Sequence, residues 1–155
     1  MGKLPLIYFA APLFNENERR FNDGLAARLA EHVDVFLPQR DGELLVELVR
    51  SGVELPIAER RVFQNDIRAL NSAALLVAIL DGGYIDEGVA FEIGFANGVG
   101  TLCVGLQTDV RRALPSGNNP MISQGLANVF DCVDSLVEWV SEWSKRRAIA
   151  CAPAA

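Results

Sequence analysis

The stretch Ala74-Leu75-Leu76-Val77-Ala78-Ile79-Leu80-Asp81-Gly82-Gly83 decides the fold class of this chain. The apolar run over residues 74–80 predicts a β-strand that is buried on both faces, as strands of parallel sheets are. The acid and the two glycines that follow favour a turn, so they end this strand. A strand of this kind requires helices on both faces of its sheet.

Strands and helices alternate along the rest of the chain. Strands are predicted over residues 6–10, 33–37, 74–80, 101–105 and, more weakly, 129–133. Helices are predicted from a cap at Asn15 or Asn17 to about residue 32, over a short segment ending near 49, from Pro56 to about 70, from near Asp86 onward, and over 136–146. Residues 39–42 are predicted to form a polar turn.

This alternation predicts a single-domain α/β fold of the Rossmann or flavodoxin-like type. It contains an open, mostly parallel five-stranded sheet with helices on both faces, and ligands bind beyond the carboxyl ends of its strands. We assign residues 1–147 to the domain. Residues 148–155 are rich in Ala and Pro and are expected to form a flexible tail.

Composition limits the class of protein further. The chain has 155 residues, half of them hydrophobic, and a formal net charge of −6. An acidic balance argues against a nucleic acid polymer or an anionic membrane surface as partner. We find no membrane-spanning run and no signal peptide. Cys103, Cys132 and Cys151 have no CxxC spacing and are expected as reduced thiols, two of them in core strands. These features predict a cytoplasmic location.

The stretch Asp86-Glu87-Gly88-Val89-Ala90-Phe91-Glu92-Ile93-Gly94-Phe95-Ala96 places an acid in the middle of an apolar helix. A helix that is apolar almost all round is typical of a buried element, so Glu92 is expected to be buried. Burying an unpaired carboxylate costs several kcal/mol, which makes such a residue rare unless it is paired, protonated or used. Glu92 is therefore either part of a polar stripe or ion pair, or a catalytic carboxylate in a pocket.

Two further acids and a tyrosine fall where such a sheet meets its ligand. Asp86 follows the third predicted strand at a helix N-terminus, where it can be a bound-ligand contact or a helix cap. Asp66 follows Asn65 inside a helix, where both side chains compete for the backbone, although a solvated face also explains the pair. Tyr8 lies at the carboxyl end of the first strand, where its hydroxyl can bond a carboxylate or have a structural role.

We predict neither a cofactor nor a metal. The sequence contains no GxGxxG, no GxxxxGK[ST] and no acidic metal loop, and His32 is its single histidine. Carboxylates with a tyrosine suit glycosyl transfer, in which one carboxylate attacks the anomeric carbon while a protonated acid assists the leaving group. This argument reaches only a reaction class, because other pairs of acids could be chosen.

Four blocks of sequence together resemble the nucleoside 2-deoxyribosyltransferases. The blocks are Tyr8-Phe9-Ala10-Ala11-Pro12-Leu13-Phe14, Gln64-Asn65-Asp66, Asp86-Glu87-Gly88-Val89-Ala90-Phe91-Glu92-Ile93-Gly94-Phe95 and Asn119-Pro120-Met121-Ile122-Ser123-Gln124-Gly125. They follow the order and spacing of that family over roughly residues 6–140. The resemblance implies transfer of 2-deoxyribose between nucleobases with retention at the anomeric carbon, in nucleotide salvage, and favours purines.

The resemblance implies catalytic roles for three residues. Glu92 matches the nucleophile that forms a covalent 2-deoxyribosyl ester, and Tyr8 matches the tyrosine that orients it. Asp66 matches the acid that protonates the departing base and deprotonates the incoming one. Glu92 must then be ionised while Asp66 holds a proton, so their environments are expected to separate their pKa values.

Four further residues match positions that bind substrate in the family. Asp86 matches a ligand of a sugar hydroxyl, and Phe14 matches an aromatic residue that lines the pocket. Asn119 matches an asparagine that enters a neighbouring subunit's site near the 5′ end of the sugar. Gln39 resembles a glutamine that contacts the base. The chain departs from the family at its end, where residues 151–155 contain no terminal tyrosine.

The resemblance also implies partners. The implied substrates are 2-deoxynucleosides and free nucleobases. The implied assembly is a homo-oligomer, a hexamer of paired subunits with shared active sites. Two alternatives stay open. In a nucleoside or nucleotide N-glycosidase, water resolves the ester, and Ala10-Ala11-Pro12 offers no Ser or basic residue for a 5′ phosphate. The other alternative is a nucleoside-binding domain without catalysis.

Overall fold

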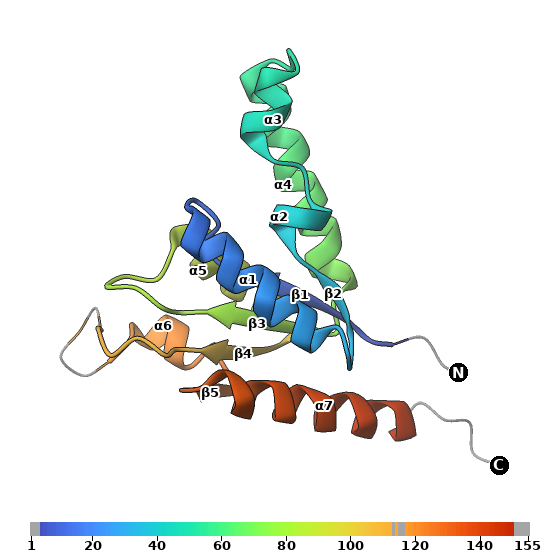
Figure 1. The fold of residues 1–155 in the computed structure, drawn as a ribbon, viewed down its shortest axis with the longest axis vertical. Coiled ribbons are helices and arrows are strands. Elements are labelled where there is room, and N and C mark those ends of the chain that lie inside the picture. Colours follow the sequence, from blue (N-terminus) through green and yellow to red (C-terminus); the bar gives the residue numbers. More distant parts are fainter. Residues whose placement is uncertain (1–3, 113, 115–116, 151–155) are drawn as a thin grey trace.

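The protein is built on one sheet of five parallel strands covered by helices on both faces (Figure 1). The computed structural model describes residues 4–112, 114 and 117–150. The strands are β1 (Leu6–Ala10), β2 (Asp34–Phe36), β3 (Leu75–Ile79), β4 (Leu102–Leu106) and β5 (Asn128–Phe130). Their order is β2-β1-β3-β4-β5, and every neighbouring pair is parallel. This order is that of flavodoxin-like folds, so the predicted fold class is confirmed.

Two sets of helices enclose the sheet. Helices α1 (Glu16–Leu29) and α7 (Val133–Ala150) cover one face, and α4 (Leu55–Ser72), α5 (Glu87–Gly98) and α6 (Pro120–Ser123) lie on the other. The short helices α2 (Pro38–Asp41) and α3 (Leu45–Arg50) connect β2 to α4. In Figure 1, α3 and the first part of α4 rise beyond the sheet as an arm.

The alternation of side chains along the central strands divides the core into two layers. In β1, Ile7 and Phe9 pack with α1 and α7, whereas Tyr8 and Ala10 pack with α4 and α5. Strand β3 divides in the same way and is buried throughout, as the apolar run predicts. Each fully buried Leu, Ile or Val contributes about 1.5–3 kcal/mol, so both layers hold the sheet in register. The alternation also fixes the face on which Tyr8 lies.

Local sequence determines where the helices begin. Asn15 caps α1 in a reciprocal capping box with Glu18, which decides between the two predicted caps. Pro56 lies in the first turn of α4, where its missing N–H costs nothing. Asp86 caps α5 by accepting hydrogen bonds from the first free backbone N–H groups of that helix.

Several predicted boundaries are wrong. The expected polar turn over residues 39–42 is instead the one-turn helix α2, which Pro38 begins and the carboxylate of Asp41 stabilises by accepting from the backbone N–H of Leu37. Helix α6 follows Asn119 where no element was predicted. Its single turn is too short to produce a periodic apolar pattern.

The C-terminal third differs in two further respects. Strand β5 ends at Phe130, so Cys132 is exposed rather than part of a core strand, whereas Cys103 is buried in β4 as predicted. Helix α7 extends from Val133 to Ala150 and therefore includes the first residues of the expected tail. Cys151 and residues 152–155 lie outside the described part of the chain. Among the described residues, no helix is long and apolar enough to cross a bilayer.

Candidate active site

A tyrosine on β1 and a glutamate on α5 meet at the carboxyl end of the sheet. The hydroxyl of Tyr8 donates a hydrogen bond of 2.5 Å to Oε1 of Glu92. Strand alternation points Tyr8 toward α5, and the ring of Phe36 on β2 stacks against it with centroids 5.5 Å apart. Both partners are held by regular secondary structure. The pair is therefore set in place before any ligand binds.

Two cavities open beside this pair. The smaller, of about 290 Å³, lies between the loop after β1, the segment from α2 to α3, and the helices α4 and α5. The larger, of about 410 Å³, lies between α3, α4 and α5 and has mostly apolar walls. Asp66 and Glu92 line both cavities. Concave, largely apolar spaces with a few converging polar groups are typical of small-molecule sites.

Burial raises the pKa of the three polar side chains Tyr8, Asp66 and Glu92. It raises the pKa of Asp66 to about 6. Burial also raises the pKa of Glu92 to about 8, against the hydrogen bond from Tyr8, which lowers it, while the charges of Asp66 and Asp86 add to the rise. The pKa of Tyr8 is raised as well, first by burial and then by the charge of Glu92, so its hydroxyl stays protonated and can donate.

The order of these pKa values is the reverse of the order expected from the implied roles. Near neutral pH the two carboxyl groups share about one proton, and that proton favours Glu92 rather than Asp66. The cause is desolvation, since Glu92 lies deeper than Asp66 and the ionised form suffers more from burial. The roles that the resemblance implies would therefore require a proton to move from Glu92 to Asp66.

Asp86 is a helix cap that also lies at the smaller cavity, so the two alternatives that the sequence left open are compatible. One carboxylate oxygen accepts from the backbone N–H groups of Gly88 at 2.9 Å and Val89 at 3.1 Å, which is a helix cap. The same side chain lines the smaller cavity next to Glu92. The cap orients the residue, and its second oxygen makes no hydrogen bond to another described residue.

The other three predicted binding residues are distributed differently. Phe14 lines the smaller cavity although 74 % of its surface is exposed. Gln39 does not line either cavity, because its side chain is hydrogen-bonded to α1. Asn119 is exposed, caps α6 by accepting from the backbone N–H of Met121 at 2.9 Å, and lies outside both cavities of its own chain.

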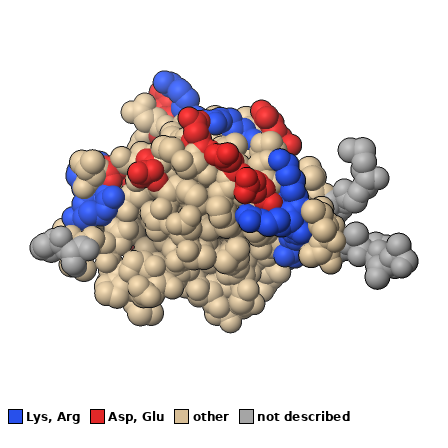
Figure 2. Space-filling view, turned by 90° about the horizontal axis from the view of Figure 1, so that it is seen from below, with Lys and Arg blue, Asp and Glu red and all other residues tan. Residues whose placement is uncertain are grey.

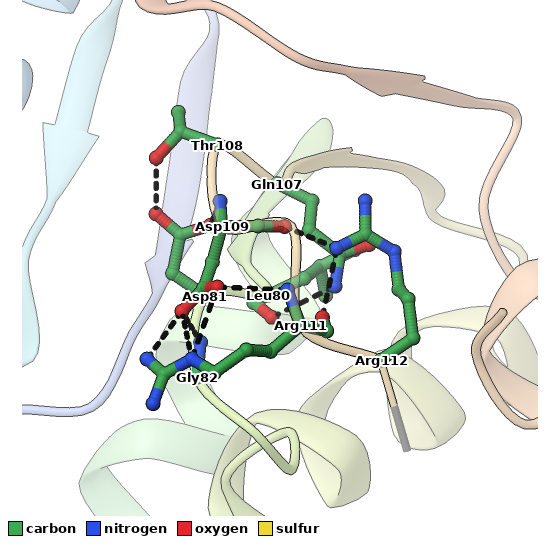
Figure 3. Close-up of polar contacts among 8 residues, drawn as sticks. All are labelled: Leu80, Asp81, Gly82, Gln107, Thr108, Asp109, Arg111 and Arg112. Carbon is green, nitrogen blue, oxygen red and sulfur yellow. Dashed lines mark hydrogen bonds and ion pairs between the residues drawn. The ribbon is translucent and has the colours of Figure 1, made fainter. Parts of the chain in front are cut away.

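A polar network ties the loop after β3 to the loop after β4 (Figure 3). Thr108 and the backbone N–H of Asp109 both donate to the carboxylate of Asp81, at 2.7 and 2.8 Å. The carboxylate of Asp109 accepts from the backbone N–H of Gly82 at 3.2 Å and forms an ion pair with Arg111. The first loop ends at the cap of α5 and the second leads toward α6. The network therefore fixes the relative positions of these two loops.

A second polar contact extends this arrangement toward α6. Gln107 is buried at the end of β4, and its amide exchanges two hydrogen bonds with the amide of Asn118, at 2.8 and 3.3 Å. Gln107 also donates to the carbonyl of Leu80 at 3.2 Å, as Figure 3 shows. Asn118 immediately precedes Asn119, so this amide pair holds the position from which Asn119 extends.

Sequence reasoning missed the apolar walls of the site. Leu45 and Val62 line both cavities, and Phe63 and Phe91 line the larger one. The ring of Phe91 lies 6.1 Å from that of Phe63, measured between centroids. The available signal was the helical spacing of Val62 and Phe63 with Asp66 along α4, which places all three toward one side.

Comparison with known proteins places the chain in a family. A family profile described as nucleoside 2-deoxyribosyltransferase matches residues 7–142. A solved structure of a conserved protein from Enterococcus faecalis V583 is 26 % identical, with a TM-score of 0.76 over 90 % of this chain and 99 % of that chain. No curated protein sequence matches the chain.

Two structures of 2-deoxyribosyltransferases share the fold. That from Bacillus psychrosaccharolyticus is 24 % identical with a TM-score of 0.70, over 85 % of this chain and 90 % of the other. That from Leishmania mexicana is 18 % identical with a TM-score of 0.58, over 89 % of this chain and 97 % of the other.

Fold and site together define a flavodoxin-like α/β protein with a carboxylate–tyrosine centre at the carboxyl edge of its sheet. Within the described ranges, no three His, Cys, Asp or Glu side chains are grouped as metal ligands. Because the family profile spans most of the sequence, the chain belongs to the nucleoside 2-deoxyribosyltransferase family.

We predict that Glu92→Gln stabilises the protein at pH 8 but not at pH 4.5. The raised pKa of Glu92 means that the folded state favours the protonated carboxyl. Its contribution to stability is therefore present below the ordinary pKa and is lost as the pH rises toward about 8. Glutamine cannot ionise and keeps an oxygen for Tyr8, so the variant should gain a few kcal/mol over wild type across this range.

Urea denaturation at several pH values measures this difference. Glu138→Gln, at an exposed position on α7, is the matched control and should show a constant difference from wild type. A difference between Glu92→Gln and wild type that does not grow from pH 4.5 to pH 8 would contradict the burial of an ionisable Glu92.

Proposed function

We propose that this protein transfers 2-deoxyribose from one nucleobase to another, with a preference for purines and with retention at the anomeric carbon. The observation that carries the proposal is the hydrogen bond of 2.5 Å between Tyr8 and Glu92 at a cavity that Asp66 also lines. It supplies a nucleophile, an orienting group and an acid at one space. Family membership supports the reaction class.

The proposed chemistry proceeds in two displacements. An ionised oxygen of Glu92 forms a bond to the anomeric carbon while the bond to the base nitrogen breaks and its electron pair goes to the base. Asp66 gives its proton to that base. The incoming base then loses a proton to Asp66 and displaces Glu92 from the sugar, and the two inversions give retention.

The remaining residues are assigned to binding. Asp86 lines the smaller cavity, and its second oxygen is assigned to a sugar hydroxyl because the other oxygen is used by the cap of α5. Phe14 contributes an aromatic ring to the wall of the smaller cavity. No Lys or Arg is among the described residues that line either cavity, which favours uncharged nucleosides over nucleotides as substrates. Apolar walls with aromatic rings suit the flat faces of purines.

Exchange of deoxyinosine with adenine tests the proposal. Chromatography should detect deoxyadenosine and hypoxanthine in the wild-type reaction, and thymidine should be a poorer donor than deoxyinosine. Glu92→Ala should abolish exchange while leaving the fold intact, as circular dichroism reports. Wild type treated with a 2-fluoro-2-deoxy nucleoside should carry a sugar adduct on the peptide that contains Glu92.

Three outcomes would contradict parts of this scheme. Free deoxyribose in place of deoxyadenosine would indicate an N-glycosidase, in which water resolves the ester. Nucleoside binding without turnover would indicate a binding domain. An adduct on another residue would remove Glu92 from the role of nucleophile.

We predict a bell-shaped dependence of kcat/KM on pH with its maximum near 7. Activity requires one proton within the pair of carboxyl groups. Below about 6 the pair gains a second proton on Asp66, and above about 8 it loses the proton from Glu92. Tyr8→Phe removes the hydrogen bond that lowers the pKa of Glu92, so the alkaline limb should move to higher pH.

The same variant should lower the maximal rate by about 10- to 1000-fold, as expected for the loss of one positioned hydroxyl. Initial rates between pH 5 and pH 9.5 measure both effects. A Tyr8→Phe enzyme with the wild-type rate and profile would reduce Tyr8 to a packing role.

We further propose that the protein is a homo-oligomer in which Asn119 completes the site of a neighbouring subunit. The smallest such assembly is a dimer, and the one we propose is a hexamer of paired subunits. Residues 93–108 and 113–130 contain no Asp, Glu, Lys or Arg. Phe63 and Phe91 at the larger cavity are 54 % and 52 % exposed, and Met121 beside Asn119 is 82 % exposed. Apolar groups of this size on a single chain favour an interface.

The surface charge supports this proposal. Figure 2 views the molecule from the side where β5 and α7 lie in Figure 1, and charged side chains form a band across the upper part of that view. The lower part is a broad area without Lys, Arg, Asp or Glu. A surface depleted of charge is typical of the centre of a protein–protein interface.

We predict that two inactive variants complement each other. Glu92→Ala removes the nucleophile, and Asn119→Ala removes the group that a subunit offers to its neighbour. After subunit exchange, mixed interfaces contain one site in which both residues are intact, so a fraction of the activity should return. Sedimentation should show no active monomer. No recovery after verified exchange, or an active wild-type monomer, would contradict the shared site.

A further inference from the structure

Asn22 is a buried amide on α1 that joins two other parts of the chain. It is 2 % exposed. Its Nδ2 donates one hydrogen bond of 2.9 Å to the carbonyl of Pro12 and another of 3.0 Å to Oε1 of Gln39. Both N–H groups of the amide are therefore used, and neither bond belongs to the helix that carries Asn22.

Gln39 completes the contact from the side of α2. Its Nε2 donates to the carbonyl of Arg19 at 2.9 Å and to Oδ1 of Asp23 at 2.8 Å. Its two N–H groups are thus occupied and its oxygen already accepts from Asn22. Donation from Gln39 to a nucleobase would require breaking one of these bonds. The geometry gives Gln39 a different task from the base contact that the resemblance implied.

The two groups that Asn22 holds belong to separate walls of the smaller cavity. Pro12 lies between Ala11 and Leu13, and both of these neighbours line the cavity. Gln39 follows Pro38, which lines the cavity from α2. One amide therefore connects the wall formed by the loop after β1 with the wall formed by α2.

Each wall is held firmly on its own side of this connection. In the loop after β1, Arg19 donates to the carbonyl of Leu13 at 3.0 Å, and Glu18 accepts from the backbone N–H of Phe14 at 2.8 Å. These contacts leave the loop little freedom relative to α1.

Helix α2 is stabilised by contacts of its own side chains. The carboxylate of Asp41 accepts from the backbone N–H of Leu37 at 2.8 Å, and Arg40 pairs with Asp41 and donates to the carbonyl of Val35 at 2.9 Å. The Arg40 guanidinium holds the pKa of Asp41 below its ordinary value, so Asp41 stays ionised and keeps these contacts over a wide pH range. The spacing between the walls then depends on the contacts that join α2 to α1, which are those of Gln39 with Asn22, Arg19 and Asp23.

We infer that the Asn22–Gln39 amide pair sets the spacing between the two walls of the smaller cavity and thereby determines which nucleobases the enzyme accepts. This inference rests on the proposed function and names the part of that site that controls base size. Asn22 and Gln39 are positioning residues, because they act through Pro12 and Pro38 rather than by touching substrate.

The direction of the hydrogen bonds makes the inference specific to an amide. At position 22 a carboxylate of the same size would face the carbonyl of Pro12 and the oxygen of Gln39, which are both acceptors. Asn22→Asp should therefore separate the walls as Asn22→Ala does, although the volume of the side chain is unchanged.

Acceptor kinetics with two bases of different size provide the test. Deoxyinosine is the donor, and adenine and the bulkier N6-benzyladenine are the acceptors. The variants are Asn22→Ala, Asn22→Asp, Gln39→Ala and the double variant Asn22→Ala/Gln39→Ala. Asn17→Ala, an exposed asparagine on the same helix, is the matched control.

We expect the KM for adenine to rise roughly 2- to 15-fold in each variant of the pair, as loss of a typical hydrogen bond allows, with kcat nearly unchanged. The ratio of kcat/KM for N6-benzyladenine to that for adenine should rise by about tenfold, because the walls can separate. The effect in the double variant should be smaller than the sum of the two single effects, since both variants remove the bond between Asn22 and Gln39. Asn17→Ala should match wild type.

Other results overturn the inference. These are an unchanged ratio in folded variants, additive effects in the double variant, or a fall in kcat without a change in KM. If the Asn22 variants fail to fold, Gln39→Ala, at a half-buried position, decides the matter alone. If wild type shows no exchange, the proposed function fails separately, and calorimetric affinities of the two bases for wild type and Gln39→Ala then replace the kinetics. Absence of binding to wild type also overturns the inference.

Discussion

The hydrogen bond between Tyr8 and Glu92 depends on a single constraint, the two-residue alternation of β1. Ile7 and Phe9 must face α1 and α7 for Tyr8 to face α5. A slip of one residue would exchange these faces, bury Tyr8 on the wrong side and leave Glu92 without its donor. The apolar packing of both layers prevents that slip. The geometry of the Tyr8–Glu92 pair is therefore a consequence of core packing. Every buried side-chain N or O in the described part of the chain has a hydrogen-bond partner.

The burial of Asp66 and Glu92 lowers the stability of the folded protein near neutral pH. Desolvation raises the pKa of both Asp66 and Glu92, so each contributes less to stability as the pH rises to neutrality. The fold tolerates this because Tyr8 offers the ionised glutamate a donor, and because its own raised pKa keeps that donor protonated. In the proposed reaction Asp66 alone changes from acid to base between the half-reactions, because Glu92 is bound to the sugar as an ester.

Sequence alone predicted the strands and their parallel arrangement, because buried runs such as residues 74–80 and the cap at Asp86 carry strong local signals. It also brought Tyr8, Asp66 and Glu92 into one site through a resemblance, and the structure places Asp66 and Glu92 at both cavities. It could not show that Gln39 binds α1 instead of the cavity, because that outcome depends on Asn22, which is distant in the chain and has no pattern that marks it. The short helices α2 and α6 escaped detection for a related reason. Each has one turn, and a single turn lacks the periodicity on which sequence analysis depends.

Transfer and hydrolysis differ only in what resolves the proposed ester, so the exclusion of water decides between them. In a single chain the exposed rings of Phe63 and Phe91 line the larger cavity, which Glu92 also lines. Solvent that enters this cavity would reach the proposed ester. A second copy placed over these rings would bury apolar surface and close the route at the same time. The proposed oligomer would thus connect these exposed aromatic residues with the proposed chemistry, since a subunit contact over the rings would also let a nucleobase compete with water.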